Sequence, residues 1–391
     1  MGLKSGGSPT SSCEEIVVTG LGIACALGDK TTSVWSRLLL GESGIETQPV
    51  ITGPGQARTL PLASLIKPSS SVAALALQVV QQALADAELE PPLATCGVVV
   101  GSSRGNQRIW ETLSSGQPPD FTQHAWLDSL PHMPALSVAG WLGTGGPLHA
   151  PMAACATGNW VIAQAVQLLQ TGQCQQVIVA AAELPISPLT VAGFSQMGVL
   201  ASTGAYPFDQ QRQGLVLGEG AAALVMETQA SAQARQKRGY GRVLGFGLSA
   251  DGYHRSTPNP NGLAAATAVR LCLKTAGLQP EMVSYINAHG TGTLLNDQTE
   301  ARLIEHLFPP DVAVSSTKGA TGHTLGASGL IEAVFCLLAL KDQTLPPCVG
   351  LREPAFDLNW VRVAGCTPVK AALSFSFGFG GQNAVVAFGE V

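Results

Sequence analysis

The chain has 391 residues, of which 46% are hydrophobic, 12% charged and 5% aromatic. This composition supplies a large buried core and excludes disordered, collagen-like and low-complexity proteins. With 21 lysines and arginines against 26 aspartates and glutamates, the net charge is −5, so a general affinity for nucleic acid or anionic membranes has no electrostatic basis.

The N-terminal segment, residues 1–13, is rich in glycine, serine and proline and lacks the apolar run of a signal peptide, so we expect it to be flexible. No uninterrupted apolar stretch of about 18 residues follows, which predicts no membrane span. Nine cysteines are scattered through the chain without any Cys-x-x-Cys motif. They indicate reduced, mostly buried thiols and a cytoplasmic location, with no disulfide framework or zinc ribbon.

Short apolar runs alternate with longer helical segments along the rest of the chain. The runs predict strands at 16–20, 97–101, 177–182, 221–226, 243–247, 284–288, 312–315, 372–375 and 384–388. The longer segments predict helices at 71–87, 154–169, 264–276, 297–307 and 328–339. This alternation predicts an α/β protein of stacked layers with parallel or mixed sheets. The helix at 154–169 is apolar on nearly every face, so we expect it to lie between two layers.

The polar, basic segment 229–242 is the clearest change in composition, and it divides the chain into parts with similar numbers of strands and helices. We expect it to be a solvent-facing connection between two related halves, residues 14–228 and 243–391. No short-period repeat indicates a solenoid or a propeller.

One cysteine differs from the other eight in its surroundings. Cys155 lies in Pro-Met-Ala-Ala-Cys-Ala-Thr-Gly at 151–158, where a strand-like segment leads into the start of the predicted central helix. The positive end of a helix and its unpaired N–H groups favour a thiolate and therefore a nucleophile. From this segment alone, a buried thiol with a purely structural role explains the residue equally well.

Two of the seven histidines occur in glycine-rich turns between a strand and a helix. His289 lies in Asn-Ala-His-Gly-Thr-Gly-Thr at 287–293, and His323 lies in Lys-Gly-Ala-Thr-Gly-His-Thr-Leu-Gly-Ala at 318–327. The backbone of such turns can approach a ligand closely. Each histidine alone would more often be structural, but together with Cys155 they form a candidate acyl-transfer site.

With these segments the sequence resembles the β-ketoacyl-acyl carrier protein synthases of the thiolase superfamily, above all their elongating type II group. The resemblance rests on Val-Val-Thr-Gly-Leu-Gly at 17–22, the cysteine segment, Pro-Phe-Asp at 207–209, Gly-Glu-Gly-Ala at 218–221, both histidine segments, and Ser-Phe-Gly-Phe-Gly-Gly-Gln-Asn at 376–383. It implies a thiolase-like fold, in which two related halves form αβαβα layers. It also implies an acyltransferase that condenses an acyl chain with malonyl-acyl carrier protein, with loss of CO2, to a 3-oxoacyl-acyl carrier protein.

The resemblance implies a role for each matching residue. Cys155 matches the nucleophile that takes an acyl chain from the phosphopantetheine arm of the carrier protein as a thioester. His289 and His323 match the pair that assists decarboxylation of the malonyl extender and stabilises the enolate. The backbone N–H groups of Cys155 and Phe379 match two oxyanion donors, and the Phe379 side chain matches a gate of the acyl pocket.

Four further residues match supporting positions of the family. Lys318 and Glu332 match a buried charged pair beside the histidines, which suits their apolar surroundings. Thr291 and Thr293 match hydroxyls that hold the pantetheine arm, although either could stabilise a turn instead. The resemblance implies no metal and no dissociable cofactor, because phosphopantetheine is carried by the substrate protein.

The implied partner is an acidic acyl carrier protein in its acyl and malonyl forms. We therefore expect a local basic patch at the active-site entrance, for which Arg104, Arg108, Arg255 and Arg270 are candidates. The resemblance implies a homodimer, and it is also compatible with a heterodimer with a related subunit.

Several positions depart from the family pattern without touching the cysteine or the histidines. The stretch 41–71 is shorter than in most relatives and lacks their basic segment, so docking of the carrier protein is expected to differ. Tyr206 stands where many relatives have arginine, Phe375 where many have asparagine, and the segment 101–106 lacks a common glycine pair. These differences favour a specialised polyketide, polyene or lipid pathway over housekeeping fatty-acid synthesis.

Three alternatives stay open. A thiolase acting on coenzyme A esters would need a second catalytic cysteine, yet Cys348 and Cys366 lie outside any glycine-rich loop. A silent partner subunit that sets chain length would have lost the nucleophile. A decarboxylase that does not condense usually carries glutamine in its place.

Overall fold

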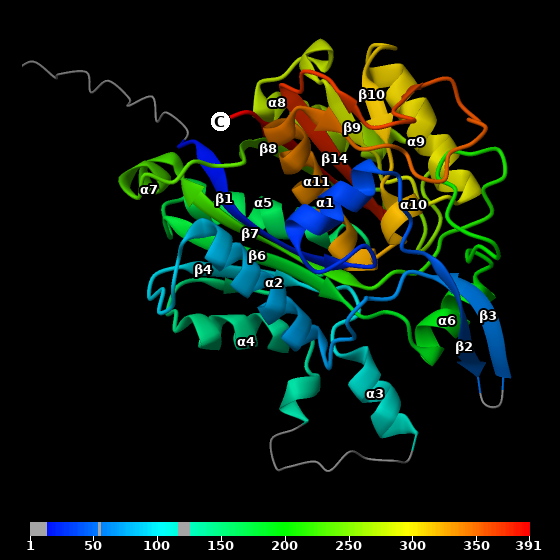
Figure 1. Ribbon diagram of the computed structural model, residues 1–391, viewed down its shortest axis with the longest axis horizontal. Coiled ribbons are helices and arrows are strands. Elements are labelled where there is room, and N and C mark those ends of the chain that lie inside the picture. The colour runs from blue at the N-terminus through cyan, green and yellow to red at the C-terminus, as the bar shows by residue number, and fades with distance from the viewer. Residues whose placement is uncertain (1–13, 54–55, 116–125) are drawn as a thin grey trace, which may run out of the picture.

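The computed structural model describes residues 14–53, 56–115 and 126–391, so the predicted flexible segment 1–13 lies outside the described residues. One large mixed sheet runs through the molecule (Figure 1), with eleven strands in the order β12-β10-β9-β14-β15-β8-β1-β7-β6-β4-β5. Its strands are β1 (Ile16–Cys25), β4 (Gly97–Gly101), β5 (Leu148–His149), β6 (Gln176–Glu183), β7 (Gly220–Thr228), β8 (Gly241–Ala250), β9 (Tyr285–Asn287), β10 (Ala313–Ser315), β12 (Asn359–Trp360), β14 (Ala371–Gly378) and β15 (Gln382–Gly389).

The sheet consists of two parts with the same internal topology. The first part runs β5-β4-β6-β7-β1 and the second runs β10-β9-β14-β15-β8, with β12 added at the far edge. Numbered along the chain, the five strands of either part have the order 3-2-4-5-1. The β4–β5, β4–β6, β9–β10 and β9–β14 pairs are parallel, whereas the β6–β7, β1–β7, β14–β15 and β8–β15 pairs are antiparallel. The two parts meet where residues 16–18 pair with residues 241–243.

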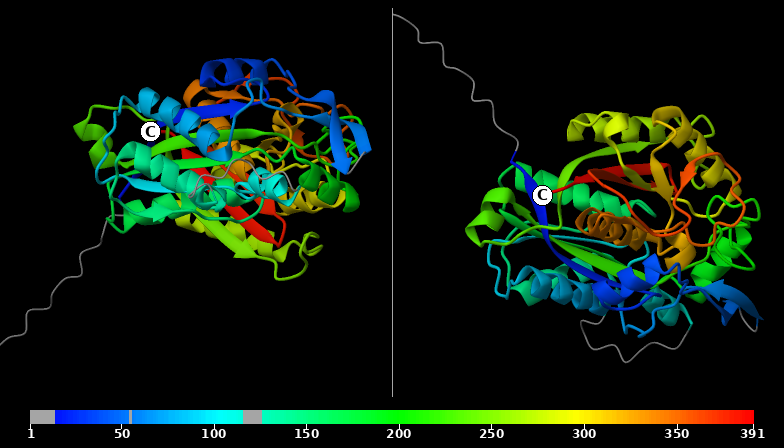
Figure 2. Two further views of the ribbon diagram at one scale, coloured as in Figure 1. Left: turned by 90° about the horizontal axis from the view of Figure 1, so that it is seen from below. Right: turned by 45° about the horizontal axis from the view of Figure 1, so that its top comes forward.

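Helices cover the outer faces of the sheet and separate its two parts. α5 (Thr157–Gln170) and α11 (Ser328–Asp342) lie in the middle, where they contact each other and strands of both parts. α2 (Val72–Ala87) and α4 (Met133–Leu142) cover the first part, and α8 (Leu263–Ala276) covers the second. The molecule therefore has five layers, αβαβα, which the right-hand view of Figure 2 shows stacked.

The central layer is apolar on all sides, as predicted for the helix at 154–169. Every residue of α11 from Ser328 to Leu340 is buried, which is typical of a helix enclosed between sheets. The two central helices pack backbone to backbone at Gly158, where a Cβ atom would lie 2.3 Å from the nitrogen of Leu330. Glycine is needed there, since any side chain would push the helices apart. No helix in the described part of the chain is both long and apolar enough to cross a membrane.

All the predicted strands and helices are present, although β1 runs five residues further than expected, to Cys25. The predicted connection 229–242 contains a short helix and the start of β8. Sequence analysis missed further elements, namely α1 (Thr31–Leu39), the hairpin of β2 (Glu46–Gly53) and β3 (Gln56–Leu62), α3 (Gln107–Ser114), α4 (Met133–Leu142), β5 (Leu148–His149), α6 (Pro188–Gln196), α7 (Gln229–Ala234), α10 (Lys318–Thr321), β11 (Thr344–Leu345), β12 (Asn359–Trp360) and β13 (Gly365–Cys366).

Candidate active site

Cys155 lies in a tight turn between β5 and α5. Ala154 has a left-handed φ of +47°, which is costly for a residue with a side chain and turns the chain sharply before the helix. The Thr157 hydroxyl secures this turn, because it accepts from the Ala153 N–H at 2.9 Å and donates to the Ala154 carbonyl at 2.7 Å. The helix therefore begins at Thr157, three residues later than predicted, and Cys155 precedes its first turn.

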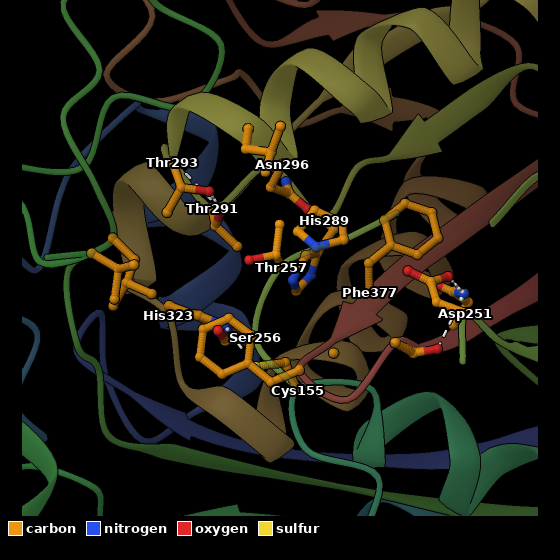
Figure 3. A pocket seen from close by; sticks show the side chains of 18 of the residues that line it. Cys155, Asp251, Ser256, Thr257, His289, Thr291, Thr293, Asn296, His323 and Phe377 are labelled. Carbon is orange, nitrogen blue, oxygen red and sulfur yellow. Dashed lines mark hydrogen bonds between the residues drawn. The ribbon is translucent and has the colours of Figure 1, made fainter. Parts of the chain in front are cut away.

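His323 contacts the Cys155 thiol, and Figure 3 shows both residues at one pocket with His289. The Nε2 atom of His323 lies 3.1 Å from Sγ of Cys155, and its Nδ1 atom lies 3.0 Å from the Ser328 hydroxyl. Ser328 in turn contacts the Thr324 hydroxyl at 3.0 Å. Because a hydroxyl can donate or accept, Ser328 supports either tautomer of the ring. Nε2 can therefore accept a proton in one tautomer and donate one in the other.

His289 lies beside His323, with the two ring centroids 5.3 Å apart. Glu300 of α9 (Leu294–Leu307) fixes the backbone at this point, since its carboxyl oxygens accept from the N–H groups of His289 at 2.6 Å and Gly290 at 2.8 Å. The His289 ring packs edge-on against the Phe377 ring, with the two ring centroids 6.1 Å apart. Its Nδ1 atom is buried and has no hydrogen-bond partner among the described residues. Backbone bonds and packing thus hold the imidazole in place.

Burial sets the protonation states of this cluster. It raises the pKa of the Cys155 thiol to about 11, against the smaller opposing effects of the Phe379 backbone N–H and the Lys318 ammonium. Burial also lowers the pKa of His289 and of His323 well below the usual range, and the charge of Lys318 lowers both further. At neutral pH the resting site therefore holds a thiol and two neutral imidazoles. The expectation that the helix end favours a thiolate is wrong for the resting site, because loss of hydration outweighs it.

Lys318 and Glu332 form an ion pair next to the histidines. Lys318 Nζ donates to Oε1 of Glu332 at 2.5 Å and to the carbonyl oxygen of His289. Both side chains are almost completely buried, at 1% and 2% exposure. Burial raises the pKa of Glu332 to about 7, and the Lys318 ammonium opposes this rise. The pair ties α10 and α11 to the loop that carries His289.

Phe379 lies in the turn between β14 and β15, above the cysteine. Its backbone N–H forms a hydrogen bond to the Cys155 thiol, which lowers the pKa of that thiol. Its ring stacks on Phe194 of α6 with the centroids 5.9 Å apart. Gly380 and Gly381 have left-handed φ values of +77° and +69°, a conformation that lets the turn bring this N–H to the thiol. The N–H lies where a donor to a thioester oxygen is required.

Cys155, His289, His323 and Phe379 line a cavity of about 210 Å³ whose wall contains both apolar and polar side chains. The predicted arm-binding residues Thr291 and Thr293 are both in its wall, with their hydroxyl oxygens 2.9 Å apart. The other lining side chains include apolar Met197, Val199, Leu215 and Phe377 and polar Ser256, Thr257 and Asn296. The cavity is smaller than the usual ligand pocket of about 300–1,000 Å³, so a long acyl chain requires a side chain to move.

Two acidic residues of α9 shape the site, and sequence analysis assigned no role to either. Besides Glu300, Asp297 accepts from the N–H groups of Phe208 at 2.7 Å and Gly292 at 3.1 Å. Burial raises the pKa of Asp297 to about 6 and that of Glu300 to about 8. Their spacing of three places them on one face of the helix that follows the glycine-rich turn. This spacing is the signal that could have identified them.

Comparison with known proteins identifies the family. The profile described as "Beta-ketoacyl synthase, N-terminal domain" matches residues 65–232, and the one described as "Beta-ketoacyl synthase, C-terminal domain" matches residues 240–352. A 3-oxoacyl-[acyl-carrier-protein] synthase 2 from Synechocystis sp. is 35% identical over 96% of this chain and 98% of its own length. The chain belongs to the β-ketoacyl synthase family. A synthase of the same name from Staphylococcus aureus is 33% identical over 97% of this chain and 99% of its own length.

Solved structures of β-ketoacyl synthases confirm the thiolase-like fold. A type II polyketide ketosynthase in complex with its acyl carrier protein, bound to a hexaketide, has a TM-score of 0.91 at 25% identity. A β-ketoacyl synthase from Burkholderia phymatum has a TM-score of 0.88 at 29% identity, and the ishigamide ketosynthase/chain length factor has the same score at 26% identity. Each similarity covers 97% of this chain and 100% of the other.

Aromatic contacts surround the two positions, Tyr206 and Phe375, at which sequence analysis expects this β-ketoacyl synthase to differ from its relatives. Tyr206 carries the guanidinium of Arg352 over its ring at 5.6 Å. Phe375 is fully buried between Phe308 at 6.3 Å and Phe377 at 5.7 Å. Phe375 adds apolar packing behind the ring that contacts His289.

The four arginines predicted to form a basic patch are in different environments. Arg108 pairs with Glu219 and donates to the Ile186 carbonyl at 3.1 Å. Arg104 is half-buried, with its Nε atom lacking a partner among the described residues. Arg255 and Arg270 are exposed and form no salt bridge within the described part of the chain. Of the predicted patch, only Arg255 and Arg270 are thus exposed cations without an ion pair.

Proposed function

We propose that this synthase condenses a Cys155-bound acyl chain with malonyl-acyl carrier protein, releases CO2 and yields a 3-oxoacyl-acyl carrier protein. One observation carries the proposal: Nε2 of His323 lies 3.1 Å from the Cys155 sulfur, inside a cavity that His289 also lines. This arrangement supports the roles of nucleophile for Cys155, proton acceptor for His323 and second hydrogen-bond donor for His289. The homology with 3-oxoacyl-[acyl-carrier-protein] synthases supports the same reaction.

In the acylation step, the Cys155 sulfur attacks the thioester carbonyl of the incoming acyl chain. The thiol proton passes to Nε2 of His323, because the thiol is neutral at rest and the neutral imidazole can accept it. Collapse of the tetrahedral intermediate breaks the bond to the pantetheine sulfur, which takes that proton. The backbone N–H groups of Cys155 and Phe379 stabilise the oxyanion.

In the condensation step, the bond between the malonyl carboxylate and the α-carbon breaks and CO2 leaves. The electron pair forms an enolate, and its oxygen accepts hydrogen bonds from the imidazole N–H groups of His289 and His323. Both rings are neutral at physiological pH, so they can donate without first being protonated. The α-carbon then attacks the acyl group, and the Cys155 thiolate leaves and takes up a proton from solvent. Burial keeps both rings neutral, the charge of Lys318 lowers their pKa further, and Lys318 fixes the loop of His289 by donating to its carbonyl oxygen.

We further propose that the enzyme serves a specialised pathway, acts without metal or dissociable cofactor, and works as a dimer of two copies or with a related subunit. The altered positions Tyr206 and Phe375 support the first point, as does the structural similarity to polyketide ketosynthases. The thiolase alternative loses support, since Cys155 is the only cysteine among the described residues that line the cavity. Thr291 and Thr293 are proposed to hold the pantetheine arm, and Phe379 to swing aside for the chain.

The test is condensation between an acyl-loaded carrier protein, which acylates Cys155, and each of two malonyl-loaded carrier proteins, one from housekeeping fatty-acid synthesis and one encoded near this gene. Mass spectrometry of the carrier detects the 3-oxoacyl product. We expect product with the wild type and with Cys272→Ser, a matched control at another buried thiol, but none with Cys155→Ala. Turnover should be faster with the neighbouring carrier. Absence of product from the wild type overturns the condensation, and equal turnover with both carriers overturns the specialised pathway.

A further inference from the structure

Three neighbouring side chains, those of Ser103, Arg104 and Glu183, have buried polar atoms that nothing in the described chain satisfies. The Ser103 hydroxyl, Nε of Arg104 and Oε2 of Glu183 each lack a hydrogen-bond partner among the described residues. Arg104 also forms no salt bridge there. Unpaired buried polar atoms are costly and therefore rare. We call these three residues the polar cluster, and it requires a partner from outside the chain.

The polar cluster lies where two parallel strands end. β4 and β6 pair in parallel, with Gly101 opposite Ala181. Ser103 and Glu183 each follow two residues later, and the Ser103 N–H donates to Oε1 of Glu183. Glu183 is completely buried, whereas Ser103 and Arg104 are half-buried. The carboxyl ends of parallel strands are a usual place for ligands in layered α/β proteins.

The polar cluster lies near the nucleophile. Burial is the main cause of the raised pKa of the Cys155 thiol, and the charge of Glu183 raises that pKa further, so the two side chains are within electrostatic range. The turn η3 (Leu325–Ala327) contacts both places. Leu325 packs in the same apolar cluster as Cys155, and a Cβ atom on Gly326 would lie 2.5 Å from Oε1 of Glu183. One turn of the chain thus connects the surroundings of Cys155 with the polar cluster.

The polar cluster offers hydrogen-bond donors to an oxygen atom. Nε of Arg104 can only donate, and the Ser103 hydroxyl can donate or accept. Burial raises the pKa of the Glu183 carboxyl to about 7, against the smaller effects of Ser103, Ser102 and the Arg104 charge. Near neutral pH this carboxyl can therefore hold a proton and donate it as well. The three side chains together suit a group that accepts hydrogen bonds.

We propose that the polar cluster selects acyl chains that carry an oxygen, as a keto, hydroxyl or carboxylate group, at the end distant from Cys155. This inference rests on the proposed condensation, since the chain is the one bound to Cys155. The cavity at Cys155 holds only about 210 Å³, so a longer chain has to extend beyond it. A methyl end at the polar cluster would leave its donors unpaired, and a site built to hydrogen-bond discriminates strongly against such a substrate. Ser103 and Arg104 are thus specificity-determining residues.

The test is acylation of Cys155 by acyl-pantetheine thioesters, followed by mass spectrometry of the protein. Straight chains of increasing length are compared, each with a methyl end and with a keto, hydroxyl or carboxylate end. For the wild type we expect the rate constant of acylation to be about tenfold or more higher with an oxygen-bearing end at the length that reaches the cluster. Ser103→Ala/Arg104→Leu should abolish this preference by accepting the methyl end. Arg302→Leu is the matched control and should keep the preference, because Arg302 is exposed on α9 and forms no salt bridge among the described residues.

Equal acylation of the wild type by both kinds of chain end, at every length, overturns the inference, because bound water then satisfies the three polar atoms. This result needs no variant, and it leaves the proposed condensation intact. A preference that Ser103→Ala/Arg104→Leu retains, whether or not its overall rate falls, also overturns the inference, since the two residues then act only on the structure. Absence of acylation of the wild type by any thioester removes the proposed reaction itself.

Discussion

The carboxylate of Glu300 makes the stability of this protein depend on pH in a direction that can be measured. Glu300 is buried, and it accepts from the N–H groups of His289 and Gly290. Its pKa is raised from the ordinary value of 4.5 to about 8, mainly by burial. Between these two values the folded state holds a proton that the unfolded state releases. The free energy of unfolding therefore falls as the pH rises from 4.5 towards 8.

The size of this effect follows from the two pKa values. Integrating the linkage relation from pH 6 to pH 8 gives a loss of about 2 kcal/mol from Glu300 alone. Glu300→Gln removes the titration while keeping an oxygen that can accept one of the two backbone bonds. The isosteric variant also places an NH2 group against a backbone N–H and loses at least one hydrogen bond, but that loss does not change with pH. The difference between wild type and variant should thus shift by about 2 kcal/mol between the two pH values, in favour of the variant at pH 8.

The assay is urea unfolding of both proteins at pH 6 and pH 8, followed by circular dichroism. Glu305→Gln is the control, since Glu305 is exposed on the same helix and should leave the pH dependence as in the wild type. If Glu300→Gln and the wild type lose the same free energy between pH 6 and pH 8, the assignment of a raised pKa is refuted. The assignment is also refuted if the wild type gains free energy of unfolding relative to Glu300→Gln as the pH rises from 6 to 8.

Two further perturbations act on the histidines. We expect His289→Ala and His323→Ala each to slow decarboxylation of malonyl-acyl carrier protein by about 10²–10⁴-fold, and to slow acylation of Cys155 by less. Release of CO2 measures the first rate, and formation of the acyl-enzyme measures the second. Unchanged decarboxylation in both variants would remove their proposed role. Lys318→Met should raise the pKa of both histidines, because the lysine charge now lowers them. Acylation of Cys155, which needs a neutral His323 to accept the thiol proton, should therefore slow at a higher pH on acidification than in the wild type. A pH profile identical to that of the wild type would contradict this electrostatic role of Lys318.

Most strands and helices could be predicted from the sequence, because short apolar runs indicate strands and longer apolar segments indicate helices in this protein. Apolar runs such as 97–101 and 177–182 are buried on both faces, and each forms a strand as predicted. The missed elements lack such patterns. α3 has no buried residue, and β2 contains a proline and several polar residues instead of an apolar run. Local sequence patterns do not predict which distant strands pair with each other. The repeated order 3-2-4-5-1 therefore became visible only in the structure.

Sequence motifs predict the residues of the candidate site, but they do not predict the properties of the site that depend on burial. Cys155, His289 and His323 stand in glycine-rich or alanine-rich turns, and the structure brings all three to one cavity. The sequence does not reveal that burial keeps the cysteine a thiol, since that depends on atoms from several layers. Nor does it reveal that Glu300 holds the backbone of His289, because an acid on a helix is usually exposed.

Identification of the acylated residue tests the central claim most directly. The protein is incubated with an acyl-loaded carrier protein, digested and analysed by mass spectrometry for the added acyl mass on each cysteine peptide. The account predicts the acyl group on Cys155 alone, and no acylated peptide from Cys155→Ala. An acyl group on any other cysteine, or acylation that persists in Cys155→Ala, would contradict it.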